Sequence, residues 1–373
     1  MKKIFVNGLS ALQGGGQTYL IHLFQEVPDV EIHLALPDEL LGKVPQHPNV
    51  VRVHAEFAQR SRLHRLIWEN FMLPNYLKAH AVGVYYQPSG TLPWCRIRSS
   101  REIIAFRNML PFAPEESGRF YLGFKRMRYW ILRQLLSRDF RRADLVIFIS
   151  QFAKQVIDKA LPSRAGRSMV IYHGLDEKFR SGGPRPMGLP AEYVLYVSIL
   201  NFYKAQVEVV RAWAEVRKLR PQTREKLVLA GPEYGPYGDL VRGEIQRLDL
   251  QKEVVLIPKV PYESLPGYYH HAKINIFASS CENCPNVLLE KLAAGRPVLS
   301  SNLEPMPEIA GSGALYFDPY APEDLCRLIL NVIDDPARLA KMGEEARRRS
   351  LEYSWPKSRR ETWDALLSLN PEA

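Results

Sequence analysis

Short apolar runs alternate with segments of helical periodicity along almost the whole chain. In the first half these runs cover residues 4–6, 32–36, 50–54, 82–86, 102–106, 145–149 and 169–172. In the second half they cover residues 193–197, 227–230, 254–257, 274–278, 297–300 and 314–317. Buried strands that alternate with helices form parallel sheets with helices on both faces. The pattern therefore predicts an α/β protein.

The alternation is interrupted once, by the Pro/Gly-rich stretch 181–186, which has the composition of a linker between domains. A chain of 373 residues is too long for one ordinary core, and its hydrophobic fraction of 46% is normal for globular domains. We predict two doubly wound domains, 1–183 and 184–354, and a C-terminal helix within 355–373.

Residues 279–302 contain the most specific chemical pattern, because they place two carboxylates, Glu282 and Glu290, on either side of a Pro-Asn turn. The preceding run suits a buried strand, and residues 287–294 have helical spacing that ends at Gly295. Glu282 is then expected in the loop at the carboxyl end of the strand, and Glu290 one turn inside the helix. A helix start with two solvated glutamates is the alternative interpretation.

The first turn of this helix is a candidate anion site. The backbone N–H groups of Asn286, Val287 and Leu288 are expected to lack partners within the helix and to point outward. Such groups bind anions, and a diphosphate has a suitable size and charge. The segment therefore indicates a site of nucleotide size.

This segment resembles the donor-site signature of the retaining GT-B glycosyltransferases of family four. The resemblance consists of Glu282, seven residues, Glu290, then Gly295, Pro297-Val298 and a Ser-Asn pair. It implies two Rossmann-like domains with parallel sheets facing across a cleft. Domain 1–183 would bind the acceptor, domain 184–354 the nucleotide sugar, and the C-terminal helix would cross back to the first domain. It also implies that Glu290 holds the ribose hydroxyls and that Glu282 lies beside the donor sugar.

The signature is not complete in this chain. The family often has Gly-Phe-Gly after the first glutamate, where this chain has Asn283, Cys284 and Pro285, so the shape of the sugar pocket is left open. Cys281 and Cys284 form a Cys-x-x-Cys pair, which raises metal or redox use as an alternative. No second pair or His couple completes a zinc site, so we predict no metal.

The first strand runs into consecutive glycines, Gly14 to Gly16, and then into a helix. Glycines at such a turn let the backbone approach a ligand, although a flexible turn would have the same composition. The family also has a Gly-rich loop here, between the donor phosphates and the acceptor. Gly15 and Gly16 are therefore candidate binding residues.

Lys204 follows the strand 193–197 and opens a helix. A cation there can neutralise the diphosphate leaving group as the sugar–phosphate bond breaks, although a surface lysine can occupy such a place without a function. The family has a lysine at this point, usually with an arginine five residues earlier, where this chain has Ile199. Lys204 would then act alone, or with help from Arg107 or Lys259.

The family commonly has His-Asp after a strand of the first domain, and this chain has Arg107-Asn108 in the corresponding place. An arginine is no general base at neutral pH, but it can pair with a phosphate or an anionic sugar. Arg107 therefore joins Glu282 and Lys204 as a candidate catalytic residue. Backbone groups near Lys259 and Val260 are candidates for recognition of the base.

The formal charge of +10 is concentrated in residues 119–142, where basic residues are mixed with aromatic and aliphatic ones. This pattern is typical of a helix on an anionic membrane surface, and equally of a core-packed helix with a solvated basic face. Many relatives approach the membrane in this region because their acceptors are lipid-linked. The chain has no nucleic-acid-binding motif, so we predict no nucleic acid partner.

We predict a metal-independent, retaining hexosyltransferase without a cofactor, which moves a sugar from a UDP- or GDP-sugar to a hydroxyl of a glycan or lipid-linked acceptor. Cell-surface polysaccharide or glycolipid synthesis is the expected role. No apolar run approaches the roughly 20 residues of a membrane span. We therefore expect a cytoplasmic protein, peripheral on the inner face of the membrane if residues 119–142 bind it. A sugar-nucleotide epimerase or hydrolase and a non-catalytic binding subunit remain alternatives.

Overall fold

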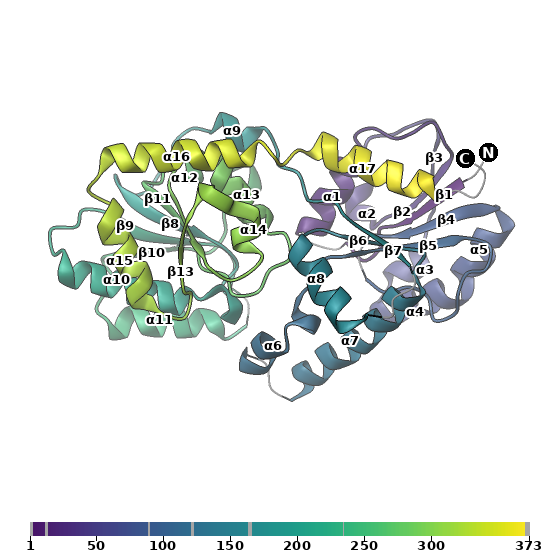
Figure 1. Ribbon diagram of the computed structural model, residues 1–373, viewed down its shortest axis with the longest axis horizontal. Coiled ribbons are helices and arrows are strands. Elements are labelled where there is room, and N and C mark those ends of the chain that lie inside the picture. Colours follow the sequence, from purple (N-terminus) through teal and green to yellow (C-terminus); the bar gives the residue numbers. More distant parts are fainter. Residues whose placement is uncertain are drawn as a thin grey trace. The chain divides into compact units, whose positions relative to one another are not determined.

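The computed structural model describes residues 3–11, 14–88, 90–120, 123–162, 166–233 and 235–369, without the side chains of residues 117, 120 and 125 (Figure 1). The chain divides into two compact units. Unit 1 contains Met1–Phe112, Gly123–Gly174 and Trp355–Ala373, and unit 2 contains Ala113–Leu122 and Leu175–Ser354.

Unit 1 is built on a seven-stranded parallel sheet with the strand order β3-β2-β1-β4-β5-β6-β7. The strands are β1 (Lys3–Asn7), β2 (Ile32–Ala35), β3 (Val50–Arg52), β4 (Val82–Gln87), β5 (Arg101–Phe106), β6 (Leu145–Phe148) and β7 (Arg167–Val170). The central strands are buried on both faces, which is why they read as continuous apolar runs in the sequence.

Helices cover both faces of this sheet (Figure 1). They are α1 (Gly15–Leu23), α2 (Asp38–Leu41), α3 (Glu56–Gln59), α4 (Arg62–Ile67), the π-helix η1 (Trp68–Met72), α5 (Leu73–Ala79), the 3-10 helix η2 (Leu110–Phe112), α7 (Phe124–Arg142), α8 (Gln151–Ala160) and α17 (Trp355–Ser368).

The C-terminal helix α17 is part of the core of unit 1. Trp363 and Leu366 belong to the same buried cluster as residues of β1 and α1. The indole nitrogen of Trp363 donates to the carbonyl oxygens of Leu23 and Glu26, each at 3.1 Å. Unit 1 is therefore assembled from both ends of the chain.

Unit 2 contains a six-stranded parallel sheet with the order β10-β9-β8-β11-β12-β13. The strands are β8 (Tyr193–Val197), β9 (Lys226–Ala230), β10 (Val254–Ile257), β11 (Ile274–Phe277), β12 (Val298–Ser301) and β13 (Leu315–Phe317). The helices are α6 (Pro114–Phe120), α9 (Lys178–Ser181), η3 (Phe202–Lys204), α10 (Gln206–Leu219), α11 (Tyr237–Arg247), η4 (Tyr262–Ser264), α12 (Leu265–His271), α13 (Asn286–Ala293), α14 (Met306–Ala310), η5 (Gly311–Gly313), α15 (Pro322–Val332) and α16 (Pro336–Ser350).

The prediction of two doubly wound parallel sheets is confirmed, and every predicted strand has a counterpart. The largest shift is at the strand predicted over 169–172, because β7 already pairs with β6 from Arg167 onward. The compact units change over between Gly174 and Leu175, whereas the predicted domain boundary follows residue 183. The Pro/Gly-rich stretch packs within unit 2, where the Gly183 carbonyl lies 3.1 Å from His271 Nε2.

No helix among the described residues is long and apolar enough to cross a membrane. The segment predicted as a basic amphipathic helix, 119–142, contains the end of α6 and all of α7. Residues 121 and 122 within it lie outside the described part of the chain.

Candidate functional site

In each sheet the strand order reverses direction at one point, and ligands of doubly wound folds bind at the carboxyl ends of the strands beside that point. In unit 2 the reversal lies between β8 and β11, which are neighbours in the sheet. Lys204 follows β8 and Glu282 follows β11. The sheet therefore brings two of the candidate residues to one place.

Lys204 and Glu282 form an ion pair between Lys204 Nζ and Glu282 Oε1. The two side chains are only 11% and 15% exposed, so the pair is largely withdrawn from solvent screening. Lys204 is the last residue of η3, and the Tyr196 hydroxyl donates to its carbonyl oxygen at 2.6 Å. Lys204 is therefore held at both its backbone and its amine.

The loops that carry this ion pair are joined by their backbones. The Ser280 N–H donates to the carbonyl oxygen of Tyr203 at 2.8 Å, and the Ser279 hydroxyl donates to the same oxygen at 3.2 Å. These contacts tie the segment after β11 to η3. The position of Glu282 is therefore set by the same contacts that position Lys204.

Glu290 lies on α13 and is only 3% exposed. Its carboxylate oxygens accept hydrogen bonds from the Tyr269 hydroxyl at 3.0 Å and from the Tyr262 hydroxyl at 3.3 Å. Burial raises the pKa of the Glu290 carboxyl to about 7, against the lowering effect of the Tyr269 hydrogen bond and the charge of Lys291. The carboxylate is therefore a buried acceptor whose charge changes near neutral pH.

Lys291, the residue after Glu290, is fully buried, and its amine donates to the Val197 carbonyl oxygen at 3.1 Å. Burial lowers the pKa of Lys291 well below its ordinary value, although the neighbouring Glu290 charge favours the protonated form. Val197 ends β8, so Lys291 anchors α13 to the strand that leads to Lys204.

The helix α13 begins at Asn286, after Pro285, one residue before the start that the sequence predicts. One detail of the prediction is wrong: the Leu288 N–H is not unpaired, because it donates to the Pro285 carbonyl oxygen at 3.0 Å. The Pro285 carbonyl oxygen, just before the helix, therefore serves as the acceptor for an N–H of the first helical turn. Asn286 and Val287 occupy the first two helical positions, where the positive end of the helix dipole favours an anion.

Lys259 and Val260 lie in the loop between β10 and η4, at another carboxyl end of the same sheet. Lys259 is exposed and Val260 is half-buried. Tyr262 follows in η4 and contacts Glu290, so this loop and α13 meet at the Glu290 carboxylate. The structure thus connects the candidate base loop to the candidate ribose residue.

Glu116 is a residue of this region that the sequence did not reveal. It lies on α6, and its carboxylate accepts from the Ser280 hydroxyl at 2.6 Å and from the Tyr320 hydroxyl at 2.5 Å. The guanidinium of Arg119 lies 3.9 Å from the centre of the Tyr320 ring. A helix from the first half of the chain is therefore fixed beside the loop that carries Glu282. No local pattern signals a contact between residues so distant in sequence.

Cys281 and Cys284 are free thiols and both are buried. Burial and the nearby charges of Glu282 and Glu116 raise the pKa of the Cys281 thiol well above its ordinary value. A thiol of this kind is a poor nucleophile and a poor metal ligand, because both roles need the thiolate. Within the described residues, no three His, Cys, Asp or Glu side chains are grouped so as to hold a metal ion.

The sequence places all three glycines of the unit 1 turn before the helix, whereas in the structure only Gly14 precedes it. Gly14 has a φ of 66°, which favours glycine, and Gly15 and Gly16 are the first residues of α1. The residues just before this turn, Leu12 and Gln13, lie outside the described chain. The turn stands at the carboxyl end of β1, which borders the reversal point between β1 and β4.

Arg107 follows β5, and its guanidinium contacts three groups of unit 1. It donates to the Pro88 carbonyl oxygen at 2.6 Å, bonds with His173 Nε2, and lies 3.7 Å from the centre of the Tyr19 ring. Because an arginine has no acceptor, the His173 nitrogen is the acceptor in this contact. Tyr19 belongs to α1, so Arg107 packs against the helix that Gly15 begins.

Two family models match the chain. One, described as "Glycosyltransferase Family 4", matches residues 13–179, and the other, described as "Glycosyl transferases group 1", matches residues 187–349. The matches correspond to the two halves of the chain and leave few residues between them.

Two curated relatives are similar to this chain at 28% and 22% sequence identity. The D-inositol 3-phosphate glycosyltransferase of Kineococcus radiotolerans is 28% identical over 65% of this chain and 58% of that protein. The serotype-specific mannosyltransferase WbdA of Escherichia coli is 22% identical over 72% of this chain and 33% of that protein. The chain thus spans between a third and about three fifths of the length of these two relatives.

Solved structures share the fold. Sucrose-phosphate synthase of Thermosynechococcus elongatus superposes with a TM-score of 0.76 at 17% identity over 100% of both chains. HepE of Anabaena in complex with UDP superposes with a TM-score of 0.71 at 19% identity, over 99% of this chain and 100% of that one. The predicted GT-B architecture is confirmed by these similarities.

Proposed function

The chain belongs to the GT-B glycosyltransferases of family four, and on this premise we propose that it moves a sugar from a nucleoside diphosphate to a hydroxyl acceptor. In this reaction the bond between the anomeric carbon and the diphosphate breaks, a bond to the acceptor oxygen forms, and the acceptor hydroxyl releases its proton to the departing diphosphate or to water. Retention at the anomeric carbon is part of the proposal and rests on the donor signature.

The Lys204–Glu282 pair at the reversal point of the unit 2 sheet is the observation that carries this proposal. It is a cation and a carboxylate at the carboxyl ends of adjacent strands, beside a helix N-terminus. Lys204 would offset the charge that accumulates on the departing diphosphate, because a fixed cation in a poorly hydrated site stabilises such charge. Glu282 would lie beside the donor sugar.

Glu290 would accept the ribose hydroxyls. The longer of its two hydrogen bonds, 3.3 Å from Tyr262, is the one that a ribose hydroxyl would replace. Tyr262 lies in η4, directly after the loop of Lys259 and Val260, which would contact the base. Gly15, Gly16 and Arg107 belong to unit 1 and would act on the phosphates and the acceptor side.

Among donors we propose a UDP- or GDP-sugar, and among acceptors a glycan or lipid-linked hydroxyl. HepE of Anabaena was solved with UDP and with UDP-glucose, and WbdA is named a mannosyltransferase. We propose no metal or cofactor, because a lysine and a helix N-terminus would supply the positive charge.

The function is tested by incubating the protein with UDP-, GDP- and ADP-sugars and measuring nucleoside diphosphate release with and without a lipid-linked acceptor. We expect release that depends on the acceptor, and thermal stabilisation by the matching nucleoside diphosphate. Release of free sugar or of an epimer without an acceptor would support an epimerase or hydrolase. Neither release nor stabilisation with any nucleotide would point to a non-catalytic subunit.

We also propose that the amino-terminal half of α7 docks on an anionic membrane. Phe124, Met127, Trp130 and Ile131 share one helical face there and are 76%, 49%, 61% and 44% exposed. Exposed basic side chains such as Arg126 stand beside them, whereas the carboxyl-terminal half packs into the core through Leu136 and Phe140. In this proposal the protein is peripheral, on the inner face of the membrane.

Sedimentation with phosphatidylglycerol vesicles tests the docking of α7. We expect the double variant Met127→Ser and Trp130→Ser to bind vesicles roughly tenfold more weakly, because two apolar side chains no longer enter the bilayer. Leu240→Ser removes an apolar side chain that is 52% exposed on α11 and should change nothing. Equal binding of both variants would refute the proposal.

A further inference from the structure

A cavity of about 490 Å³ opens at the amino-terminal edge of the unit 1 sheet, opposite to the carboxyl ends that carry Gly15 and Arg107. Five of its lining residues are arginines and one is an aspartate; they are Arg96, Arg101, Arg141, Arg142, Arg167 and Asp144. The remaining lining comes from Ala143, Gly166 and the end of α17. No role in the proposed transfer reaction accounts for this concentration of positive charge.

Parallel pairing aligns the charged residues along this edge. Arg101 begins β5, Asp144 precedes β6 and Arg167 begins β7. The Asp144 N–H donates to the Glu102 carbonyl oxygen at 2.8 Å, and the Arg167 N–H donates to the Asp144 carbonyl oxygen at 3.2 Å. The backbone positions of these residues are therefore fixed by the sheet.

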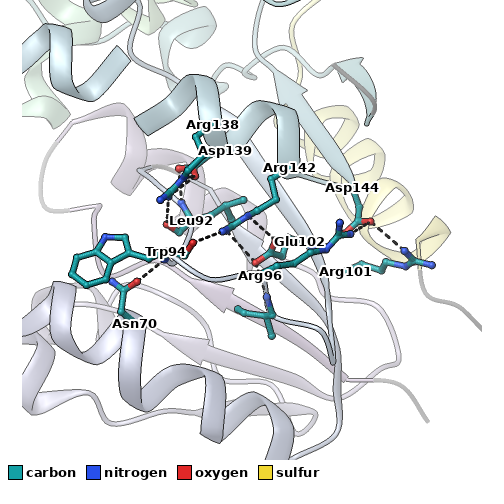
Figure 2. A network of polar contacts seen from close by, with 11 residues as sticks. Asn70, Leu92, Trp94, Arg96, Arg101, Glu102, Arg138, Asp139, Arg142 and Asp144 are labelled. Carbon is teal, nitrogen blue, oxygen red and sulfur yellow. Dashed lines mark hydrogen bonds and ion pairs between the residues drawn. The ribbon is translucent and has the colours of Figure 1, made fainter. Parts of the chain in front are cut away.

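Asp144 holds two of the arginines in place (Figure 2). Its Oδ1 accepts from Arg96 Nη2 at 2.9 Å and from Arg101 Nη1 at 3.2 Å, while its Oδ2 accepts from the Glu102 backbone at 2.9 Å. Each of the two arginine contacts uses one nitrogen of a guanidinium that carries five N–H donors. The carboxylate therefore orients the two side chains and leaves donors for a further anion.

Arg142 is fixed by hydrogen bonds of its own. Its Nη2 donates to the buried Glu102 carboxylate at 3.2 Å and its Nη1 donates to the Trp94 carbonyl oxygen at 3.0 Å (Figure 2). Burial raises the pKa of the Glu102 carboxyl, and the Arg142 charge opposes this shift. Two guanidinium nitrogens of Arg142 are therefore hydrogen-bonded within unit 1, and the residue still lines the cavity.

The dipole of α7 accounts for only two of the five arginines that line the cavity. Arg141 and Arg142 lie in the last turn, where cations offset the negative end of the helix dipole. Arg96, Arg101 and Arg167 come from a loop and two strand ends, so the dipole does not account for them. Convergent guanidinium groups repel one another, and an anion between them removes that cost.

We propose that this cavity binds the phosphate groups of a second ligand. Arginine forks match phosphate oxygens in a bidentate geometry, and 490 Å³ lies within the range of small-molecule sites. The phosphate is provided either by a free phosphorylated molecule or by a lipid headgroup, and both present the same oxygens to the arginines. This proposal does not rest on the proposed transfer reaction.

Calorimetric titration of the full chain with inorganic pyrophosphate at low ionic strength tests the site. UDP is kept in excess, so that a donor site, if present, is filled. The double variant Arg141→Gln and Arg167→Gln removes two exposed guanidinium groups of the lining. We expect its affinity to fall about tenfold or more. The matched control, Arg327→Gln with Arg338→Gln, removes the same charge from α15 and α16 and should bind like the wild type.

The single variant Arg141→Gln, at an exposed helix position, keeps the test valid if the double variant is unstable, and should weaken binding in part. Pyrophosphate is also added to protein bound to phosphatidylcholine vesicles that contain phosphatidylglycerol. If it displaces more protein than sodium chloride of equal ionic strength does, the ligand is a lipid headgroup. Binding of pyrophosphate without such displacement identifies a free phosphorylated ligand. Equal affinity of the wild type and both Arg141 variants, or no binding by the wild type, overturns the proposal whatever the outcome of the transfer assay.

Discussion

Glu290→Ala should bind the donor nucleotide about 100-fold more weakly than the wild type, a loss of about 3 kcal/mol. The reason is the position of the carboxylate, which is buried on α13 and accepts hydrogen bonds from the hydroxyls of Tyr262 and Tyr269. A ribose would offer two further hydroxyls of the same kind. The measurement is the dissociation constant of the nucleoside diphosphate that stabilises the wild type.

The pH dependence of the same affinity is a second readout. Burial raises the pKa of the Glu290 carboxyl to about 7, so the group is protonated below that value and ionised above it. Ribose hydroxyls donate to the ionised form. The affinity of the wild type should therefore rise as the pH increases through about 7, and that of Glu290→Gln should not change in this range.

Two controls separate ribose binding from a structural effect. Glu290→Gln keeps an acceptor for the Tyr269 hydroxyl and should fold like the wild type. Tyr262→Phe removes the hydroxyl that competes for the carboxylate and should leave donor affinity equal or higher. If Glu290→Ala kept the affinity of the wild type, the ribose assignment would be wrong.

Lys204→Met should lower kcat about 100- to 1,000-fold, the size of effect seen when one fixed charge-stabilising group is removed from an active site. The amine is the cation at the reversal point of the unit 2 sheet, and the side chain is 11% exposed. Water cannot replace it efficiently in so poorly hydrated a place. Turnover with saturating donor and acceptor is the measurement, and Lys204→Arg should retain part of the activity.

Loss of Lys204 also leaves Glu282 without its ion-pair partner, which by itself lowers stability. The double variant Lys204→Met and Glu282→Gln removes both charges and should recover the melting temperature. It should not recover kcat, because the leaving group still lacks its cation. Recovery of kcat together with stability would show that Lys204 acts only through the fold.

The strands could be predicted from the sequence because both sheets are parallel and buried on both faces, so each strand leaves a continuous apolar run. The first residue of β7 could not be predicted, because pairing with β6 rather than hydrophobicity decides where the strand begins. Glu282 and Lys204 were recognised separately. Their contact depends on the adjacency of β8 and β11, which is a property of the sheet and not of either segment.

Other parts of the candidate site have no local signal at all. Glu116 meets Ser280 and Tyr320 only because α6 packs in unit 2, although the residues before and after Ala113–Leu122 belong to unit 1. The Leu288 amide was expected to be unpaired, and the turn at Pro285 supplies its acceptor. Backbone hydrogen bonds at helix ends depend on the preceding turn, whose conformation the residue types do not determine alone.

The packing of α17 limits how this protein can be recombined with its relatives. The last helix completes the core of unit 1, where Trp363 donates to the carbonyl oxygens of Leu23 and Glu26. A chimera that exchanges only the first half of the chain would place a foreign surface of α1 against the native α17. Exchange of unit 1 alone would therefore need four crossover points, after residues 112, 122, 174 and 354, so that the terminal helix travels together with the segment that it covers.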